Sequence, residues 1–212
     1  MKCDKNIMLL YAVTDKAWTG KQSLYQQVES ALKGGVTCVQ LREKDLCDED
    51  FLSEAMEISA LCKKYEVPFF INDNVDIAIK VKADGIHVGQ EDMNVLQVRQ
   101  RVGVEMIIGV SVHSVEEALK AVKNGADYLG VGAMFSTSTK TDVDVLPKEV
   151  LCDICSAVEI PVVAIGGIGK SNIAELKGTG VDGVALVSAI FAAVDIESEC
   201  RSLYELSKEM VN

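Results

Sequence analysis

The sequence is poor in aromatic residues and in histidine, and it has no apolar run long enough to cross a membrane. Aromatic residues make up 5% of the 212 residues, as in folds built from aliphatic strands and helices. Two histidines are too few for a histidine-rich metal centre. The amino terminus runs directly into a short apolar strand pattern without the apolar stretch of a signal peptide. These absences argue against a membrane protein and a secreted protein.

Acidic residues outnumber basic ones, and the formal net charge is -11. Nucleic acids and anionic membranes bind basic surfaces, so neither is an expected partner. An anionic small molecule would have to be held by local cations, because the overall field repels it. The sequence leaves the oligomeric state open, a homo-oligomer included.

Seven scattered cysteines favour a reducing, cytoplasmic location over a disulfide framework. Cys152 and Cys155 have the spacing of a redox motif. They fall in a stretch, 148–158, that is typical of a helix interior. A thioredoxin-like pair would lie at a turn between a strand and a helix, so a redox role is disfavoured.

Apolar strand-like runs alternate with amphipathic helical stretches along the whole chain. The strands are continuous apolar runs, which indicates parallel strands buried on both faces. Eight units of roughly 26 residues each favour an α/β fold with a single (β/α)8 TIM barrel over residues 1–212. An open doubly wound sheet is the alternative, but its glycine-rich motif is replaced by Thr14-Asp15-Lys16-Ala17 after the first strand. The expected strands are 8–13, 36–41, 68–71, 85–88, 106–110, 128–131, 162–165 and 183–187; expected helices include 22–33, 49–65, 115–123 and 198–210.

Charged residues follow two successive strands. Gln40, Arg42 and Lys44 alternate along the chain and so share one face at the carboxyl end of a strand. Asn72 and Asp73 end the next strand. Cations beside a magnesium-type carboxylate suit a polyphosphate ligand. A solvated charge cluster is the alternative.

Asp92 follows the fourth strand much as Asp73 follows the third. Two carboxylates on adjacent strand ends repel each other unless a cation lies between them, and Mg²⁺ fits such a pair. Asp92 could instead cap the helix expected over 94–101. His87 is flanked by apolar residues, which favours a packed residue over a base.

The later units supply hydroxyl groups and glycines. Ser111 ends the fifth strand, where a lone serine is usually a cap, and no neighbouring histidine supports a nucleophilic role. Residues 136–140 place hydroxyl groups before a lysine, as in a phosphate-binding loop or a disordered polar loop. Small residues at Gly166-Gly167 and Val187-Ser188 mark strand-to-helix junctions, the recurrent phosphate site of this barrel class. The sequence therefore predicts two anion sites in one mouth.

Taken in order, these segments resemble the thiamine phosphate synthase family over essentially the whole chain. The matching segments are Gln40-Leu41-Arg42-Glu43-Lys44, Ile71-Asn72-Asp73, Asp84 to Asp92, Gly109-Val110-Ser111, Thr137-Ser138-Thr139-Lys140, Gly166-Gly167-Ile168 and Val187-Ser188. Family members commonly have proline near Ala133 and at Ser136, and this chain has neither.

The resemblance implies transfer of an aminopyrimidine methyl group from its pyrophosphate ester to the ring nitrogen of thiazole phosphate, or of its carboxylated form. The implied roles are as follows: the pyrimidine pyrophosphate is held by Gln40, Leu41, Arg42, Glu43, Lys44, Asn72, Ser111 and Lys140; the thiazole phosphate by Thr137, Ser138, Thr139, Gly167, Val187 and Ser188; and one Mg²⁺ per subunit by Asp73 and Asp92. Arg42, Lys44, Lys140 and Ser111 would be the catalytic residues.

This chemistry needs no general base, because the thiazole nitrogen has a free lone pair and no proton to lose. Three alternatives stay open. A thiazole tautomerase has a similar barrel but does not need residues that bind pyrophosphate. A sugar-phosphate isomerase or epimerase needs a base at the substrate carbon. A non-catalytic phosphate-binding barrel would bind without turnover.

Overall fold

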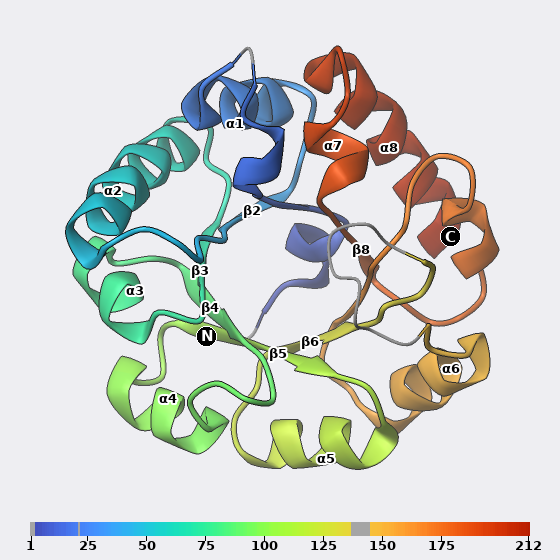
Figure 1. Ribbon diagram of the computed structural model, residues 1–212. Helices are drawn as coiled ribbons and strands as arrows, with labels where there is room; N and C mark the ends of the chain where they lie inside the picture. Colours follow the sequence, from blue (N-terminus) through green and yellow to red (C-terminus); the bar gives the residue numbers. More distant parts are fainter. Residues whose placement is uncertain (1–2, 21, 137–144) are drawn as a thin grey trace.

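Eight parallel strands close into a barrel in the computed structural model, which describes residues 3–20, 22–136 and 145–212 (Figure 1). Each strand pairs with the next along the chain, and β1 pairs with β8 through the register Tyr11 to Ala185. This closure confirms the predicted barrel and excludes the open sheet. The strands are β1 Leu10–Val13, β2 Cys38–Leu41, β3 Phe69–Asn72, β4 Gly85–Val88, β5 Ile107–Val112, β6 Tyr128–Val131, β7 Val162–Ile165 and β8 Gly183–Leu186.

Helices surround the strands as an outer ring (Figure 1). The segment between β7 and β8 forms the short 3₁₀ helix η3, Ile173–Leu176. None of the helices in the described ranges is long and apolar enough to cross a membrane. The α-helices are α1 Leu24–Lys33, α2 Asp48–Lys64, α3 Val75–Val81, α4 Val95–Val102, α5 Val115–Lys123, α6 Lys148–Ala157, α7 Ser188–Phe191 and α8 Ile196–Val211; two further 3₁₀ helices are η1 Lys5–Met8 and η2 Lys16–Trp18.

Two boundaries differ from the prediction for clear local reasons. The first strand begins at Leu10, because residues 5–8 form η1, which is capped by the Asp4 carboxylate. Helix α1 begins at Leu24, because Ser23 and Gln26 form a reciprocal capping box that fixes its first turn. Cys152 and Cys155 both lie within α6, as predicted, and burial raises the pKa of the Cys155 thiol to about 12.

Side chains of each strand alternate between two apolar layers. One layer lies between the strands and the helices and includes Leu41. The other fills the barrel and includes Tyr11, Phe70 and Tyr128. This alternation turns Gln40 toward the barrel interior and its neighbour Leu41 toward the helices.

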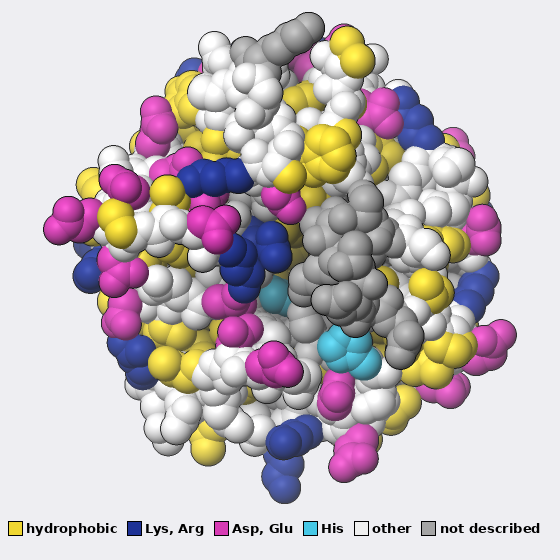
Figure 2. All heavy atoms as spheres, in the orientation of Figure 1, with side chains coloured by type: hydrophobic (Ala, Val, Ile, Leu, Met, Phe, Trp, Pro, Cys, Tyr) yellow, Lys and Arg dark blue, Asp and Glu magenta, His cyan; other side chains and the backbone are white. Residues whose placement is uncertain are grey.

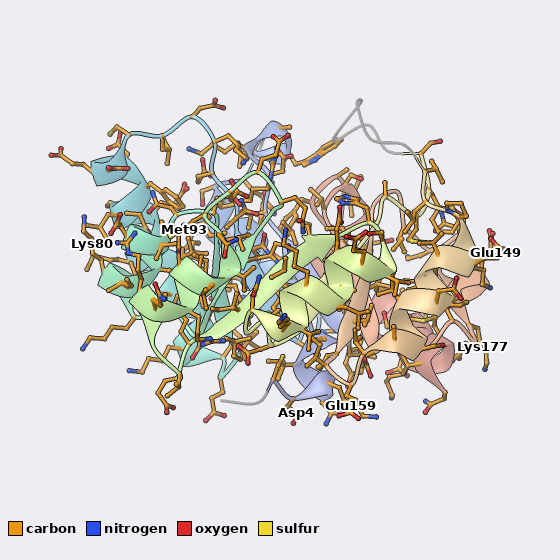
Figure 3. The ribbon with its side chains drawn as sticks, turned by 90° about the horizontal axis from the view of Figure 1, so that it is seen from below. Asp4, Lys80, Met93, Glu149, Glu159 and Lys177 are labelled. Carbon is orange, nitrogen blue, oxygen red and sulfur yellow. The ribbon has the colours of Figure 1, made fainter. Side chains whose placement is uncertain are left out.

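A repeated contact fastens the amino end of the barrel. Before each even-numbered strand, a side-chain oxygen accepts a hydrogen bond from a backbone N–H of the preceding odd-numbered strand. The pairs are Thr37 Oγ1 with Leu10 at 2.9 Å, Asp84 with Phe69 at 2.9 Å, Asp127 with Ile108 at 2.8 Å and Asp182 with Val162 at 3.0 Å. In Figure 3, Asp4 and Glu159 lie at this end of the molecule, which is well separated from the opposite mouth.

Candidate active site

A cavity of about 160 Å³ opens at the carboxyl end of the barrel. Figure 2 shows basic and acidic side chains gathered beside a central hollow on the side of β2 to β4. Most of the predicted binding residues that the structure describes lie around this one cavity. The lining residues are Tyr11, Val13, Gln40, Arg42, Asn72, His87, Ser111, His113, Gly130, Gly132, Ala133, Val163, Ile165, Gly166, Gly167, Ile168, Ala185, Leu186, Val187 and Ser188.

The segment after β2 presents only its alternate residues to the cavity. Gln40 and Arg42 line it, whereas the Leu41 side chain packs in the outer apolar layer. Glu43 also faces away: its carboxylate forms an ion pair with Lys16 at 3.0 Å and is almost fully buried. Ligand binding by Leu41 or Glu43 therefore stays a prediction, and it would have to involve their backbone atoms.

The residues after β1 hold this segment in place, a role that the sequence did not reveal. Thr14 Oγ1 accepts a hydrogen bond from the Arg42 N–H at 3.0 Å, and the Thr14 N–H donates to the Gln40 carbonyl at 2.9 Å. The Asp15 carboxylate lies 3.6 Å from the Arg42 guanidinium. Opposite charges at matching positions after two neighbouring strands, Asp15 with Arg42 and Lys16 with Glu43, are the signal that could have indicated it.

Asp73 and Asp92 lie side by side at the rim of the cavity. Burial and the neighbouring Asp73 carboxylate raise the pKa of Asp92, which would protonate more readily than an ordinary aspartate. The Lys44 ammonium group lies 2.6 Å from Asp73 Oδ2 and supplies the local positive charge. No cluster of three or more potential metal-ligating side chains occurs among residues 3–20, 22–136 and 145–212. Two carboxylates suit Mg²⁺, which takes few protein ligands and completes its shell with water and phosphate oxygens.

The alternative role of Asp92 as a helix cap is wrong. Asn94 caps α4 by accepting a hydrogen bond from the Leu96 N–H at 2.9 Å. The Asp92 carboxylate instead accepts from the Gly89 N–H at 2.7 Å, within the loop that follows β4. This bond turns the carboxylate back toward the strand end, where Asp73 lies.

Ser111 does have a neighbouring histidine, contrary to the expectation from sequence. His87 Nε2 lies 2.9 Å from Ser111 Oγ, because β4 and β5 are adjacent and both side chains face the barrel interior. His87 Nδ1 in turn lies 2.9 Å from the Tyr128 hydroxyl. The imidazole thus lines the cavity and is hydrogen-bonded at both nitrogens, while a neutral phenol provides little support for a positively charged imidazole during nucleophilic catalysis.

A continuous chain of hydrogen bonds runs below the cavity. Gln40 Nε2 donates to the Tyr11 hydroxyl at 2.7 Å, and the Tyr11 and Tyr128 hydroxyls are 2.9 Å apart. Tyr128 then reaches His87, and His87 reaches Ser111. Burial raises the pKa of both phenols well above the ordinary value, so both keep their protons.

The strand ends opposite this polar side form a second, backbone-rich wall. Gly167 has φ +65°, in the left-handed region, and its carbonyl accepts a hydrogen bond from Asn172 Nδ2 at 2.9 Å. Val187 and Ser188 complete the wall where α7 begins. Small residues with exposed backbone amides are typical of phosphate sites in this barrel class.

The predicted loop residues Thr137, Ser138, Thr139 and Lys140 lie outside the described residues. The chain that leads to them is anchored to this wall. Met134 and Phe135 donate backbone hydrogen bonds to the carbonyls of Ile165 and Gly166, each at 3.0 Å.

Comparison with known proteins identifies the group to which this barrel belongs. The family model for thiamine monophosphate synthase matches residues 10–190. The chain belongs to this family. It is 46% identical to the thiamine-phosphate synthase of Clostridium acetobutylicum over 94% of this chain and 95% of that one. Identity to the Ruminiclostridium cellulolyticum protein of the same name is 49%, covering 93% and 94%.

Solved structures agree. A thiamine phosphate pyrophosphorylase from Pyrococcus furiosus superposes with a TM-score of 0.91 and 39% identity, covering 98% of this chain and 99% of that one. The match in both sequence and structure confirms the resemblance predicted from the ordered segments. It favours a synthase over the tautomerase and sugar-phosphate alternatives.

Proposed function

We propose that this chain is a thiamine phosphate synthase, which joins 4-amino-2-methyl-5-hydroxymethylpyrimidine pyrophosphate to thiazole phosphate and releases pyrophosphate. Family membership supports the reaction. The observation that carries the assignment of substrates is one cavity with two unlike walls. Arg42 and the nearby Lys44 provide cations on one side, and Gly167 and Ser188 provide a backbone-rich phosphate wall on the other.

Asp73 and Asp92 would hold one Mg²⁺ together with the substrate pyrophosphate. When bound, Mg²⁺ neutralises negative charge on pyrophosphate oxygens. Burial, followed by the neighbouring Asp73 carboxylate, raises the pKa of Asp92, so a cation between the two carboxylates would favour their charged forms. Lys44 already contacts Asp73 and could turn toward the pyrophosphate.

In the proposed reaction, the bond between the pyrimidine methylene carbon and the pyrophosphate oxygen breaks first. The electron pair leaves with the pyrophosphate, and the pyrimidine 4-amino group donates electrons to the cationic methylene. The lone pair of the thiazole nitrogen then forms the new carbon–nitrogen bond, so no proton has to be removed. Arg42 and Lys44 stabilise the departing negative charge, with Lys140 in the role that the family resemblance implies. Preorganised charges of this kind are usually the largest contribution to catalysis.

Two further properties belong to the proposal. All seven cysteines are free thiols, which favours the reducing environment of the cytoplasm. Assembly into a homo-oligomer stays a prediction.

The test is to incubate the purified protein with both substrates, with Mg²⁺ or with a chelator, and to follow thiamine phosphate and pyrophosphate. We expect product only with Mg²⁺. Isomerisation of the thiazole without condensation would favour the tautomerase. Binding of both substrates without turnover would favour the non-catalytic barrel. Turnover that is unchanged by the chelator would contradict the metal site while leaving the synthase intact.

A further inference from the structure

The middle of the hydrogen-bonded chain from Gln40 to Ser111, which consists of Tyr11, Tyr128 and His87, has no part in the mechanism described so far. Its two central phenols have almost no exposed surface, with Tyr11 1% and Tyr128 0% exposed, and their hydroxyls are hydrogen-bonded to protein groups. Its ends, Gln40 and Ser111, both line the cavity. The chain therefore connects two positions of the cavity through the barrel interior.

The barrel is built to accommodate this chain. A side chain at Gly109 would put its Cβ 2.1 Å from the Tyr128 ring, and one at Gly130 would put it 3.1 Å from the His87 ring. Only glycine at 109 lets the phenol pass, because no Cβ tolerates so short a contact. The glycines at 109 and 130 thus provide the space that the Tyr128 and His87 rings occupy.

The direction of donation follows from the need to satisfy buried groups. Gln40 Nε2 donates to the Tyr11 oxygen, so the Tyr11 proton goes to the Tyr128 oxygen, a stronger acceptor than the nearby Cys38 sulfur. The Tyr128 proton then goes to His87 Nδ1. This leaves the His87 proton on Nε2, from which it is donated to Ser111 Oγ.

Each end of the chain is consequently left with one defined function. Gln40 turns its N–H₂ group toward Tyr11, where one of its two N–H bonds donates to the phenol oxygen, so its carbonyl oxygen is the acceptor left for a ligand. Ser111 Oγ has accepted from His87, so its hydroxyl proton is available to donate. One acceptor and one donor match the edge of a 4-aminopyrimidine, whose amino group donates and whose adjacent ring nitrogen accepts. A 4-oxopyrimidine presents the reverse pattern.

We infer that Tyr11, Tyr128 and His87 are positioning residues that fix this acceptor and donor and so select a 4-aminopyrimidine over its 4-oxo counterpart. The inference rests on the proposed function for the identity of the ring. Without the Tyr128 hydroxyl, the Tyr11 proton loses its oxygen acceptor, and only the weak Cys38 sulfur remains. The Gln40 amide can then turn to accept from Tyr11, and His87 can adopt the other tautomer, which reverses both ends.

The experiment measures dissociation constants by calorimetry for two unreactive ligands, the 4-amino-2-methyl-5-hydroxymethylpyrimidine monophosphate and its 4-oxo counterpart. The wild type should prefer the amino ligand by at least about tenfold, since leaving buried polar groups mismatched is costly. Tyr128→Phe should reduce the preference to less than about threefold by removing that selection. Inorganic pyrophosphate should bind the wild type and the variant equally, because the cations are untouched.

Tyr204→Phe is the matched control, since Tyr204 lies on α8, outside the barrel, with Lys208 over its ring. It should keep the wild-type preference. Thermal unfolding shows whether Tyr128→Phe folds. If it does not, Tyr11→Phe replaces it, because this variant breaks the same chain next to Gln40. It should also reduce the preference for the amino ligand to less than about threefold. A merely structural role would weaken both ligands equally and leave their ratio unchanged.

Two failures can be told apart. A folded Tyr128→Phe or Tyr11→Phe protein that keeps the wild-type ratio would overturn the inference and leave the proposed function standing. A folded wild type that binds neither pyrimidine and forms no thiamine phosphate would overturn the proposed function, and this inference with it.

Discussion

Aspartates at the two ends of the barrel are in opposite environments. At the amino end, Asp84, Asp127 and Asp182 each accept a hydrogen bond from a backbone N–H of the adjacent strand. At the carboxyl end, Asp73 and Asp92 lie against each other, and the pKa of Asp92 is raised. The same residue type therefore joins strands at one end and concentrates negative charge at the other.

The aspartates at the amino end of the barrel therefore contribute to stability, and those at the carboxyl end contribute to function. A carboxylate that accepts a backbone N–H is favoured in the folded state. Two adjacent carboxylates disfavour it unless a cation joins them. We therefore expect substitutions at the amino end to lower stability with little effect on the rate, and substitutions at the carboxyl end to lower the rate with little effect on stability.

Asp73→Asn should have the largest effect. We expect a loss of about 10²–10³-fold in the rate of thiamine phosphate formation, because a preorganised electrostatic contact to the leaving group is weakened. The free energy of unfolding should change by less than about 1 kcal/mol, because the exposed Lys44 pair is lost while repulsion with Asp92 is relieved. Asparagine is the suitable replacement since Asp73 has φ +63°, a conformation that Asn tolerates.

Asp76→Asn is the control for this prediction. Asp76 lies in the first turn of α3, and its side chain is 66% exposed in a pair with Arg101. Its rate should match the wild type. An Asp73→Asn enzyme that retains more than a tenth of the wild-type rate would separate Asp73 from the pyrophosphate site.

Gly167→Ala should have the next largest effect, on the phosphate wall. A Cβ at this position would lie 2.5 Å from the Ser136 carbonyl oxygen and 2.6 Å from that of Phe135. The resulting shift should lower kcat/KM for thiazole phosphate by about 10–100-fold, because small displacements of binding groups are costly. Steady-state kinetics with each substrate varied in turn would measure it.

Gly178→Ala is the matched control at the amino end. Gly178 also has a positive φ, +80°, but a Cβ there would meet nothing within 4 Å. It should lower stability through backbone strain alone and leave kcat/KM unchanged. Equal kinetic losses in the two variants would mean that strain, and not the contact with residues 135 and 136, is responsible.

Asp127→Ala tests the amino end itself. The substitution leaves the Ile108 N–H and the Arg99 guanidinium without this partner, and both Asp127 and Arg99 side chains are only about 20% exposed. The free energy of unfolding should fall by about 1–3 kcal/mol. In a chain of this length each kcal/mol lowers the melting temperature by roughly 2–4 °C. Turnover per folded molecule should not change.

Asp76→Ala provides the comparison for stability. Its pair with Arg101 is more exposed, so its loss should cost less than about 1 kcal/mol. Calorimetry of both variants checks the prediction. A similar loss of stability in the two would show that the backbone contact of Asp127 contributes nothing beyond a surface ion pair.

Much of the fold could be predicted because buried parallel strands give continuous apolar runs. The strands Gly85–Val88, Tyr128–Val131 and Val162–Ile165 begin and end where the sequence predicts. Two of the boundaries that differ depend on local capping, by Asp4 and by Ser23 with Gln26, which apolar periodicity does not report.

The candidate site could be predicted where a polar or charged residue stands at the end of an apolar strand. Arg42, Asn72 and Ser111 are examples, and all three line the cavity. Tyr11 and Tyr128 were missed because each lies within an apolar run and is typical of core packing. Their strands, β1 and β6, are not neighbours, so the two hydroxyls meet only across the interior of the closed barrel. The register of β4 and β5 places His87 against Ser111, a contact between residues far apart in the sequence.

A second pair of carboxylates, Glu43 and Glu54, gives the smallest predicted effect. Burial, followed by the neighbouring Glu43, raises the pKa of Glu54 from 4.5 to about 7; Lys16 opposes this shift and Glu57 adds to it. The folded state thus favours protonated Glu54. Its contribution to stability is complete below about pH 4.5 and is lost as the pH rises through about 7.

Glu54→Gln should remove this pH dependence, because the amide can donate to Glu43 at any pH. Thermal unfolding at about pH 5 and about pH 8 should show a smaller difference between the two conditions than in the wild type. At the higher pH the variant should be the more stable protein, by less than Asp127→Ala loses. Glu57→Gln, at an exposed position of α2, should keep most of the wild-type difference. An unchanged pH dependence in Glu54→Gln would mean that Glu54 stays ionised beside Glu43 in the folded protein. Repulsion between carboxylates would then affect only Asp73 and Asp92.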